Sequence, residues 1–156
     1  MVLKLWSGTS IHALHLAKRG YEITGLEISA EMLEVARARI EDARPNLSQN
    51  TPETPIPLFL EGDIRTTRLQ RTYDAVIAIF HVMSYQTSNE DVSAAFATVR
   101  EHLTPGGVFL FDFWYGPAVL TETPSIRIKR IADECTAITR IAEPMMRPNE
   151  NLVEVH

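Results

Sequence analysis

The sequence has little of several features that would assign a protein to a well-defined class. It contains one cysteine, Cys135, among 156 residues, so it can form neither an internal disulfide nor a thiolate cluster. Basic residues number 15 against 20 acidic ones, which gives a net charge of −5. Binding to nucleic acid needs a surplus of basic groups, so we expect no nucleic-acid partner. The balance favours a protein that handles a small molecule.

Long apolar runs and metal-ligand clusters are also missing. No stretch approaches the ~20 apolar residues that cross a bilayer, and the apolar segment before Trp6 is too short for a signal peptide. The histidines and carboxylates do not recur at the spacings of metal ligands, so we expect no metal site. We therefore predict a cytoplasmic protein with no membrane partner.

The order of the expected elements indicates the fold. Strands alternate with helices up to residue 114, and such crossovers are typical of a mostly parallel sheet with helices on its faces. After residue 114 the polar and apolar residues alternate, as in antiparallel strands with one wet face. The sequence therefore predicts a Rossmann-like α/β core over residues 1–114. It also predicts an antiparallel hairpin or meander over residues 115–156, as an extension of the same domain.

Prolines and caps set several expected boundaries. Ser29 can cap the second helix, which should end near Arg44 because Pro45 follows. Four prolines between Pro45 and Pro57 predict an exposed loop. We expect two buried strands, at residues 73–80 and at residues 108–114. A further strand is expected to start in residues 151–156.

Acidic residues follow two of the expected strands, at the edge where open parallel sheets bind ligands. Glu27 comes 19 positions after Gly8, close to the offset at which an acidic side chain meets a ribose. Asp63 follows Gly62 at the end of the third strand. By itself, the position of Glu27 does not distinguish a nicotinamide cofactor from S-adenosylmethionine.

The whole pattern resembles the class I S-adenosylmethionine-dependent methyltransferases. Their first motif is similar to V-L-D-L-G-C-G-T-G, an acidic residue ends strand two, Gly-Asp ends strand three, and L-x-P-G-G precedes strand five. The matching segments here are Val2–Ser10 (VLKLWSGTS), Glu27, Gly62–Asp63 and Leu103–Gly107 (LTPGG). The Tyr115-Gly116-Pro117 segment resembles the subgroup that methylates amino groups on nucleotide-linked sugars.

The resemblance implies S-adenosylmethionine as cofactor and assigns residues to it. Glu27, with Ile28 beside it, would hold the ribose hydroxyls. Asp63 would accept from the adenine amino group, with Ile64 packed against the ring. Gly8 would let the backbone approach the methionine part.

The resemblance also implies a methyl-transfer site bordered by Phe80, a further cofactor contact, and by His81. His81 is the nearest candidate for a catalytic base, although a histidine at a strand end is often structural. Tyr85 could line the pocket of a small-molecule acceptor or simply cover the core.

Three residues depart from the family pattern. Lys4 stands in place of an acidic residue, and Trp6 and Ser10 stand in place of glycines. Glycine at such positions permits positive φ and a close approach to the ligand. We therefore expect impaired cofactor binding.

The family's additional helix before strand one and final strands after the hairpin are not found in this sequence. A sheet without them exposes an edge and apolar faces, so we expect a homodimer or larger assembly, formed by self-association or by exchange of elements between subunits.

Two functions remain open: a small-molecule methyltransferase, or a non-catalytic protein of the same fold that acts as an oligomeric or binding module. A nicotinamide oxidoreductase is disfavoured because its phosphate loop needs several glycines and only Gly8 is present.

Overall fold

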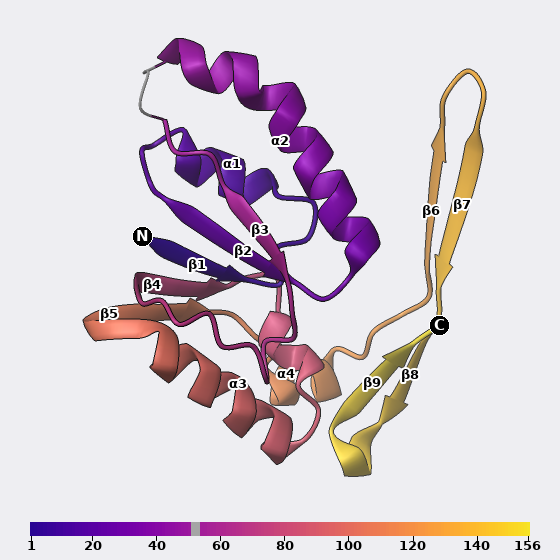
Figure 1. The fold of residues 1–156 in the computed structure, drawn as a ribbon. Coiled ribbons are helices and arrows are strands. Elements are labelled where there is room, and N and C mark those ends of the chain that lie inside the picture. Colours follow the sequence, from indigo (N-terminus) through magenta and orange to yellow (C-terminus); the bar gives the residue numbers. More distant parts are fainter. Residues whose placement is uncertain (51–53) are drawn as a thin grey trace. The chain divides into compact units, whose positions relative to one another are not determined.

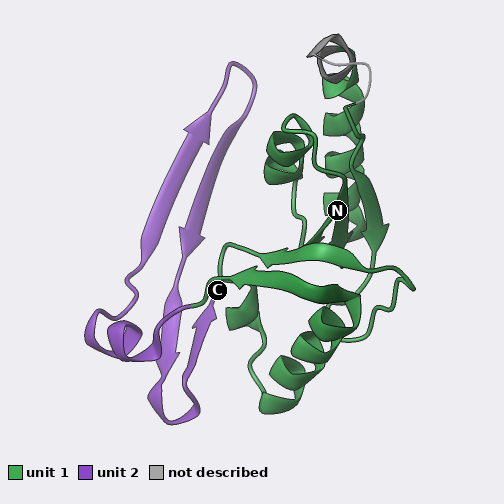
Figure 2. Cartoon of the chain, turned by 90° about the vertical axis from the view of Figure 1, so that its left-hand side faces the viewer, with its two compact units in different colours: residues 1–113 green, residues 114–156 purple. Residues whose placement is uncertain are grey.

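Two compact units make up the chain (Figure 1 and Figure 2). The computed structural model describes residues 1–50 and 54–156. The first unit is Met1–Phe113 and the second is Trp114–His156. The boundary falls close to the one expected from the sequence, and the assignment of both units to one domain stays a prediction.

The first unit is built on a parallel sheet of five strands in the order β3-β2-β1-β4-β5. Val2 of β1 pairs with Ile23 on one side and with Ala75 on the other. The predicted Rossmann-like α/β fold is confirmed. In chain order the elements are β1 (Val2–Leu5), α1 (Ile11–Ala17), β2 (Ile23–Glu27), α2 (Ala30–Asn50), β3 (Leu58–Glu61), β4 (Tyr73–Ala78), the 3₁₀ helix η1 (Val82–Tyr85), α3 (Asn89–His102) and β5 (Leu103–Phe111).

Apolar side chains of the sheet divide between two cores, one on each face. Because successive residues of a strand point to opposite faces, Leu3 and Val2 of β1 belong to different cores. Leu3 shares its core with Val99 of α3. Val2 shares the other with Ala13 of α1 and Leu33 of α2. Helices α1 and α2 thus cover one face and α3 covers the other (Figure 1).

Helix α2 is longer than the sequence predicts. It runs to Asn50 with Pro45 inside it, so the expected end near Arg44 is wrong. Proline removes one N–H from a helix and crowds the preceding turn, but its own φ is helical, so the next residues can continue the helix. Of the loop expected over 45–57, residues 45–50 are helical, residues 51–53 lie outside the described residues, and residues 54–57 have no regular structure.

The fourth strand also departs from expectation. β4 ends at Ala78 rather than Phe80, because Phe80 and His81 have φ values of 69° and 48°. These left-handed values are incompatible with a strand. They turn the chain into η1, which the sequence pattern does not predict.

The fifth strand starts earlier than predicted and is not buried on both faces. β5 begins at Leu103, which pairs with Tyr73, and regular pairing resumes at Val108 after an irregularity. Val108 and Leu110 are 61% and 59% exposed, while Phe109 and Phe111 pack on the core. The expectation of a strand buried on both faces is therefore wrong for β5.

The second unit contains a short helix and two antiparallel hairpins. β6 pairs with β7, and β8 pairs with β9, in two separate sheets. The strand expected in residues 151–156 therefore joins its own hairpin and extends no meander. Asn151, with a φ of 53°, lies in the turn that reverses the chain for this pairing. The elements are α4 (Gly116–Thr121), β6 (Arg127–Ala132), β7 (Ala137–Ala142), β8 (Pro144–Arg147), η2 (Pro148–Glu150) and β9 (Leu152–Val155).

Candidate functional site

The loop after β1 has an unusual backbone. Trp6, Gly8 and Ser10 have φ values of 52°, 54° and 70°, in the left-handed region that favours glycine. The Lys4 ammonium lies beneath this loop and donates to the carbonyl oxygens of Trp6, at 3.0 Å, and Ser7, at 3.2 Å. Lys4 therefore holds the loop through its carbonyl groups.

Lys4 is a buried charge, with 3% of its surface exposed. Burial lowers its pKa to about 8, and the nearby charge of Glu27 opposes that shift. The two carbonyl contacts and the carboxylate partly replace the water that the ammonium has lost.

Glu27, at the end of β2, is tied to the same loop. Its carboxylate accepts from the backbone N–H groups of Gly8 at 2.7 Å, Ile28 at 3.0 Å and Ser29 at 3.1 Å. The residue is 1% exposed. A carboxylate has about four acceptor positions, so about one is left. Glu27 and Gly8, which the sequence singled out by their spacing, are thus in direct contact, and their roles toward a cofactor stay predictions.

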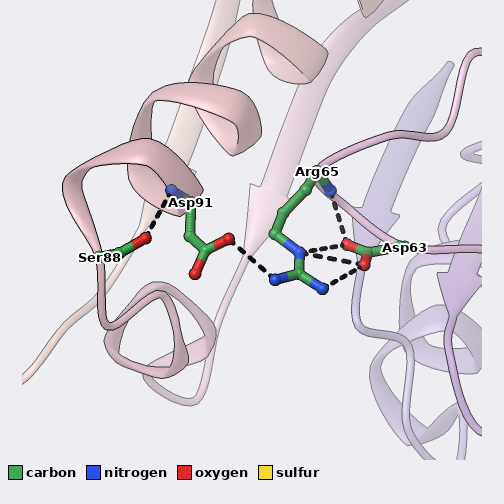
Figure 3. A network of polar contacts seen from close by, with 4 residues as sticks. All are labelled: Asp63, Arg65, Ser88 and Asp91. Atoms are coloured by element: carbon green, nitrogen blue, oxygen red, sulfur yellow. Dashed lines mark hydrogen bonds and ion pairs between the residues drawn. The ribbon is translucent and has the colours of Figure 1, made fainter.

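Asp63 follows β3 and belongs to the polar network shown in Figure 3. One Asp63 carboxylate oxygen accepts from the backbone N–H of Arg65 at 2.8 Å, and the Arg65 guanidinium forms an ion pair with the other at 2.6 Å. Arg65 also reaches Asp91 at 2.8 Å, and Ser88 caps α3 by accepting from the Asp91 N–H. The Arg65 hydrogen bonds hold the pKa of Asp63 below its ordinary value, so Asp63 is ionised at neutral pH.

A cavity of about 210 Å³ is lined by residues at or after the ends of β1, β2 and β3 and by residues in and after η1. It brings together the predicted residues Ile28, Asp63 and Ile64. Its volume is below the roughly 300–1,000 Å³ of a site for a whole drug-sized ligand, and suits part of one. The lining residues are Trp6, Leu26, Ile28, Gly62, Asp63, Ile64, Arg65, Tyr85 and Gln86.

The polar and apolar residues that line this cavity fit the nucleoside part of S-adenosylmethionine. Asp63 is ionised and has 23% of its side chain exposed, which suits an amino group, although Arg65 already makes four hydrogen-bond contacts with its two carboxylate oxygens. Leu26, Ile28 and Ile64 supply apolar walls for a flat ring. Glu27 and Gly8 are not among the lining residues, because the loop closes over Glu27.

Phe80 and His81 lie apart from this cavity lining. Phe80 is 61% exposed and its ring lies 5.1 Å from that of His12. The backbone N–H of His81 donates to Asp112 at 2.9 Å, and the His81 ring lies 6.0 Å from that of Tyr85. Tyr85 therefore connects His81 to the cavity.

Sequence reasoning did not identify Arg65 and Gln86 as site residues. Arg65 follows Asp63 by two positions, which is the one signal that could have suggested a local ion pair. The contact of Arg65 with Asp91 joins residues far apart in the chain, so no local pattern indicates it.

Among the described residues, no group of three or more His, Cys, Asp or Glu side chains could hold a metal ion. Within the part of the chain that the structure describes, no helix has the length and apolar character needed to cross a membrane.

Comparison with known proteins now decides the family. Residues 2–107 match the family model described as a methyltransferase domain. The chain belongs to the class I S-adenosylmethionine-dependent methyltransferases. The match covers β1 to β4 and the first residues of β5. It includes Trp6, in the loop after β1, and Asp63, in the loop after β3.

This methyltransferase domain is similar to two curated sugar N,N-dimethyltransferases. It is 29% identical to the dTDP-3-amino-3,4,6-trideoxy-alpha-D-glucopyranose N,N-dimethyltransferase of Streptomyces venezuelae, over 99% of this chain and 59% of that protein. It is 27% identical to the dTDP-3-amino-3,6-dideoxy-alpha-D-glucopyranose N,N-dimethyltransferase of Streptomyces fradiae, over 99% of this chain and 55% of that protein. The chain thus spans little more than half the length of these relatives.

Solved structures of methyltransferases show the same fold. DesVI of Streptomyces venezuelae is 26% identical, with a TM-score of 0.73, over 99% of this chain and 66% of that one. The amino pentose methyltransferase CalS10 of Micromonospora echinaspora, solved with S-adenosylmethionine bound, is 26% identical, with a TM-score of 0.69, over 94% of this chain and 56% of that one.

Proposed function

We propose that this methyltransferase domain binds S-adenosylmethionine and transfers its methyl group to a small-molecule acceptor. The observation that carries the proposal is the cavity in which ionised Asp63 meets apolar and aromatic walls, at the carboxyl ends of the strands. Open parallel sheets bind ligands at this edge, next to the point where the strand order reverses between β1 and β4.

The cofactor contacts that we propose are those that the family resemblance implies, applied to the loop and the cavity. Asp63 accepts from the adenine amino group, and Ile28 and Ile64 pack on the ring. Glu27 accepts from a ribose hydroxyl through its remaining acceptor position, or in exchange for the Gly8 N–H. The Gly8 backbone lies next to the methionine part.

The acceptor we infer is an amino group on a nucleotide-linked sugar, because the names of the similar S. venezuelae and S. fradiae proteins describe such substrates. When bound, S-adenosylmethionine supplies an electrophilic methyl group on a positively charged sulfur. An amine attacks only in its neutral form, so a base nearby accelerates the reaction. His81, with Phe80 bordering the same strand end, is the residue that we assign to accept that proton.

A second candidate function is a non-catalytic, oligomeric or binding module with the methyltransferase fold. The specific observation in its favour is Glu27, whose carboxylate is 1% exposed and already accepts three backbone N–H groups. In this alternative the loop no longer binds the cofactor, and the Glu27 carboxylate only stabilises the backbone of the loop.

Isothermal titration of the chain with S-adenosylmethionine and S-adenosylhomocysteine tests the proposal. We expect micromolar binding, about −8 kcal/mol, and a loss of at least tenfold in Asp63→Asn. Asp42→Asn is the matched control, because Asp42 is an exposed carboxylate on α2. No heat from either ligand, with a folded chain by circular dichroism, would favour the non-catalytic alternative.

We also propose that the chain forms a homodimer or larger assembly, with exchange of elements as one route. The support is the exposed apolar face of β5, where Val108 and Leu110 are 61% and 59% exposed at an edge of the sheet. A cytoplasmic location stays a prediction from the low cysteine content.

A further inference from the structure

A pair of aromatic rings lies at the carboxyl ends of β1 and β4. The ring of Trp6 is 4.6 Å from the ring of Tyr85, with an angle of 46° between their planes. Trp6 comes directly after β1, and Tyr85 is the last residue of η1 after β4. Both side chains line the cavity that contains Asp63.

The backbone of Trp6 is held in a conformation that is costly for a large side chain. Its φ of 52° is uncommon for any residue except glycine. The buried Lys4 ammonium donates to the Trp6 carbonyl at 3.0 Å and so helps to keep it there. Strain of this kind clusters at ligand sites, where it positions a group for binding. The group that it positions here is the indole ring against Tyr85.

Asp63 and the aromatic pair lie at the ends of different strands of the sheet. β1 lies two strands from β3 in the sheet, roughly 10 Å at the usual spacing between strands. A nucleoside that places its amino group at Asp63 therefore extends toward Trp6 and Tyr85 with its other end. In S-adenosylmethionine that other end carries the sulfonium.

The cavity offers no free carboxylate to balance a positive charge. Among the described residues that line it, the charged ones are Asp63 and Arg65. These two form an ion pair of 2.6 Å, and Arg65 also pairs with Asp91, which lies outside the lining. Glu27 lies outside the lining and is occupied by backbone N–H groups. Besides the neutral amide of Gln86, the lining offers the aromatic rings of Trp6 and Tyr85, and aromatic faces attract a cation.

We propose that Trp6 and Tyr85 form a sulfonium-recognition surface, by which this chain prefers charged S-adenosylmethionine over neutral S-adenosylhomocysteine. This inference rests on the proposed function, since it needs the cofactor to bind. It gives the departure at Trp6 a role: the glycine-like backbone is kept and an indole ring is added where the cation lies. Discharge of the cofactor after methyl transfer weakens this contact and favours product release.

The test compares the dissociation constants of the two ligands in the full chain by calorimetry. The ratio of the S-adenosylhomocysteine constant to the S-adenosylmethionine constant should fall by roughly 3- to 30-fold in Trp6→Leu and in Tyr85→Leu, the range expected for loss of a cation–π contact. Trp6→Phe should keep most of the preference. Tyr21→Leu should keep all of it, because Tyr21 is an aromatic residue, 49% exposed, that does not line this cavity.

The outcomes separate this inference from the proposed function. An unchanged ratio in both leucine variants, with both ligands still bound, overturns the sulfonium surface and leaves the methyltransferase proposal standing. Tighter binding of both ligands by Trp6→Leu also overturns it, because the indole would then be blocking the site. Binding of neither ligand by the unmodified chain overturns both. Tyr85 is 58% exposed, so Tyr85→Leu tests the proposal even if a change at Trp6 prevents folding.

Discussion

At the scale of single residues, Lys4 stands where the family pattern has an acidic residue, and the structure shows how its charge is accommodated beneath the loop after β1. The ammonium is buried, and it donates to two carbonyl groups of the loop it supports. The loop N–H of Gly8 turns instead to Glu27. The Lys4 cation thus binds carbonyl groups of the loop, and the Glu27 anion binds one of its amide N–H groups.

The buried Lys4 should make stability depend on alkaline pH. Its pKa is lowered from 10.5 to about 8 in the folded chain, because burial disfavours the ammonium. Below about pH 8 both states are protonated and burial costs about 3 kcal/mol. As the pH rises from there toward 10.5 the folded chain binds fewer protons than the unfolded one. Through this group, therefore, the free energy of unfolding rises with pH.

Urea denaturation from about pH 7 to about pH 10 measures this contribution. In Lys4→Met the free energy of unfolding should lack the rise with pH that the unmodified chain owes to Lys4. Lys18→Met, a change at an exposed lysine, should retain that rise. Equal pH dependence of the unmodified chain and Lys4→Met would contradict the assignment of the lowered pKa to Lys4.

Positive φ values at non-glycine residues gather at the ends of two neighbouring strands. Trp6 and Ser10 follow β1, and Phe80 and His81 follow β4. Each costs roughly 1–2 kcal/mol relative to the right-handed conformation. Strain concentrated where the strand order reverses supports a binding site there and is difficult to explain by packing alone.

At the scale of elements, the Asp63 network links the loop after β3 to the start of α3. Arg65 pairs with Asp63 beside it and with Asp91 in the first turn of the helix (Figure 3). Ser88 completes the helix cap from the other side of Asp91. Asp63, which we propose accepts from the adenine amino group, is therefore linked through Arg65 to a helix on which it does not lie.

Loss of Arg65 should loosen both ends of this link. In Arg65→Met we expect faster amide hydrogen exchange in residues 63–67 and in the first turn of α3. Arg68→Met is the matched control, because Arg68 lies in the same loop but pairs with Glu101, near the end of α3, at 2.7 Å. If the amide hydrogens in the first turn of α3 exchange at the same rate in Arg65→Met and in the unmodified chain, the link is contradicted.

At the scale of the whole molecule, the parallel sheet has two edges, β3 and β5. The face of β5 that carries Val108 and Leu110 is apolar and exposed. A neighbouring groove of about 650 Å³ is lined mainly by apolar side chains, including Leu110, Ile77 and Ile79. An exposed apolar surface of this kind favours association.

Sedimentation velocity over a range of concentrations should therefore show a dimer or larger species. Leu110→Lys places a charge on the exposed face and should shift the chain toward monomer. Val35→Lys provides the control, because Val35 is 45% exposed on α2, away from β5. A chain that stays monomeric at every concentration would contradict self-association.

The alternation of strands and helices determined the Rossmann-like fold, because apolar periodicity and turn residues are local signals that survive in any context. The cap at Ser29 was predictable for the same reason. The course of α2 through Pro45 was not, since a proline disfavours a helix without forbidding one. The two separate hairpins depended on pairing between strands, which a single strand's pattern does not specify.

The sequence by itself indicated that Glu27 ends the second strand and that Asp63 follows the third, and the structure brings Ile28, Asp63 and Ile64 together in one cavity. Only the tertiary structure decided what those residues contact. The Gly8 N–H on Glu27, the pair of Arg65 with Asp91 and the tilted contact between the Trp6 and Tyr85 rings each join segments brought together by the sheet or its loops. Local preferences of the chain set its elements, but the distances between their side chains arise only once the strands have paired.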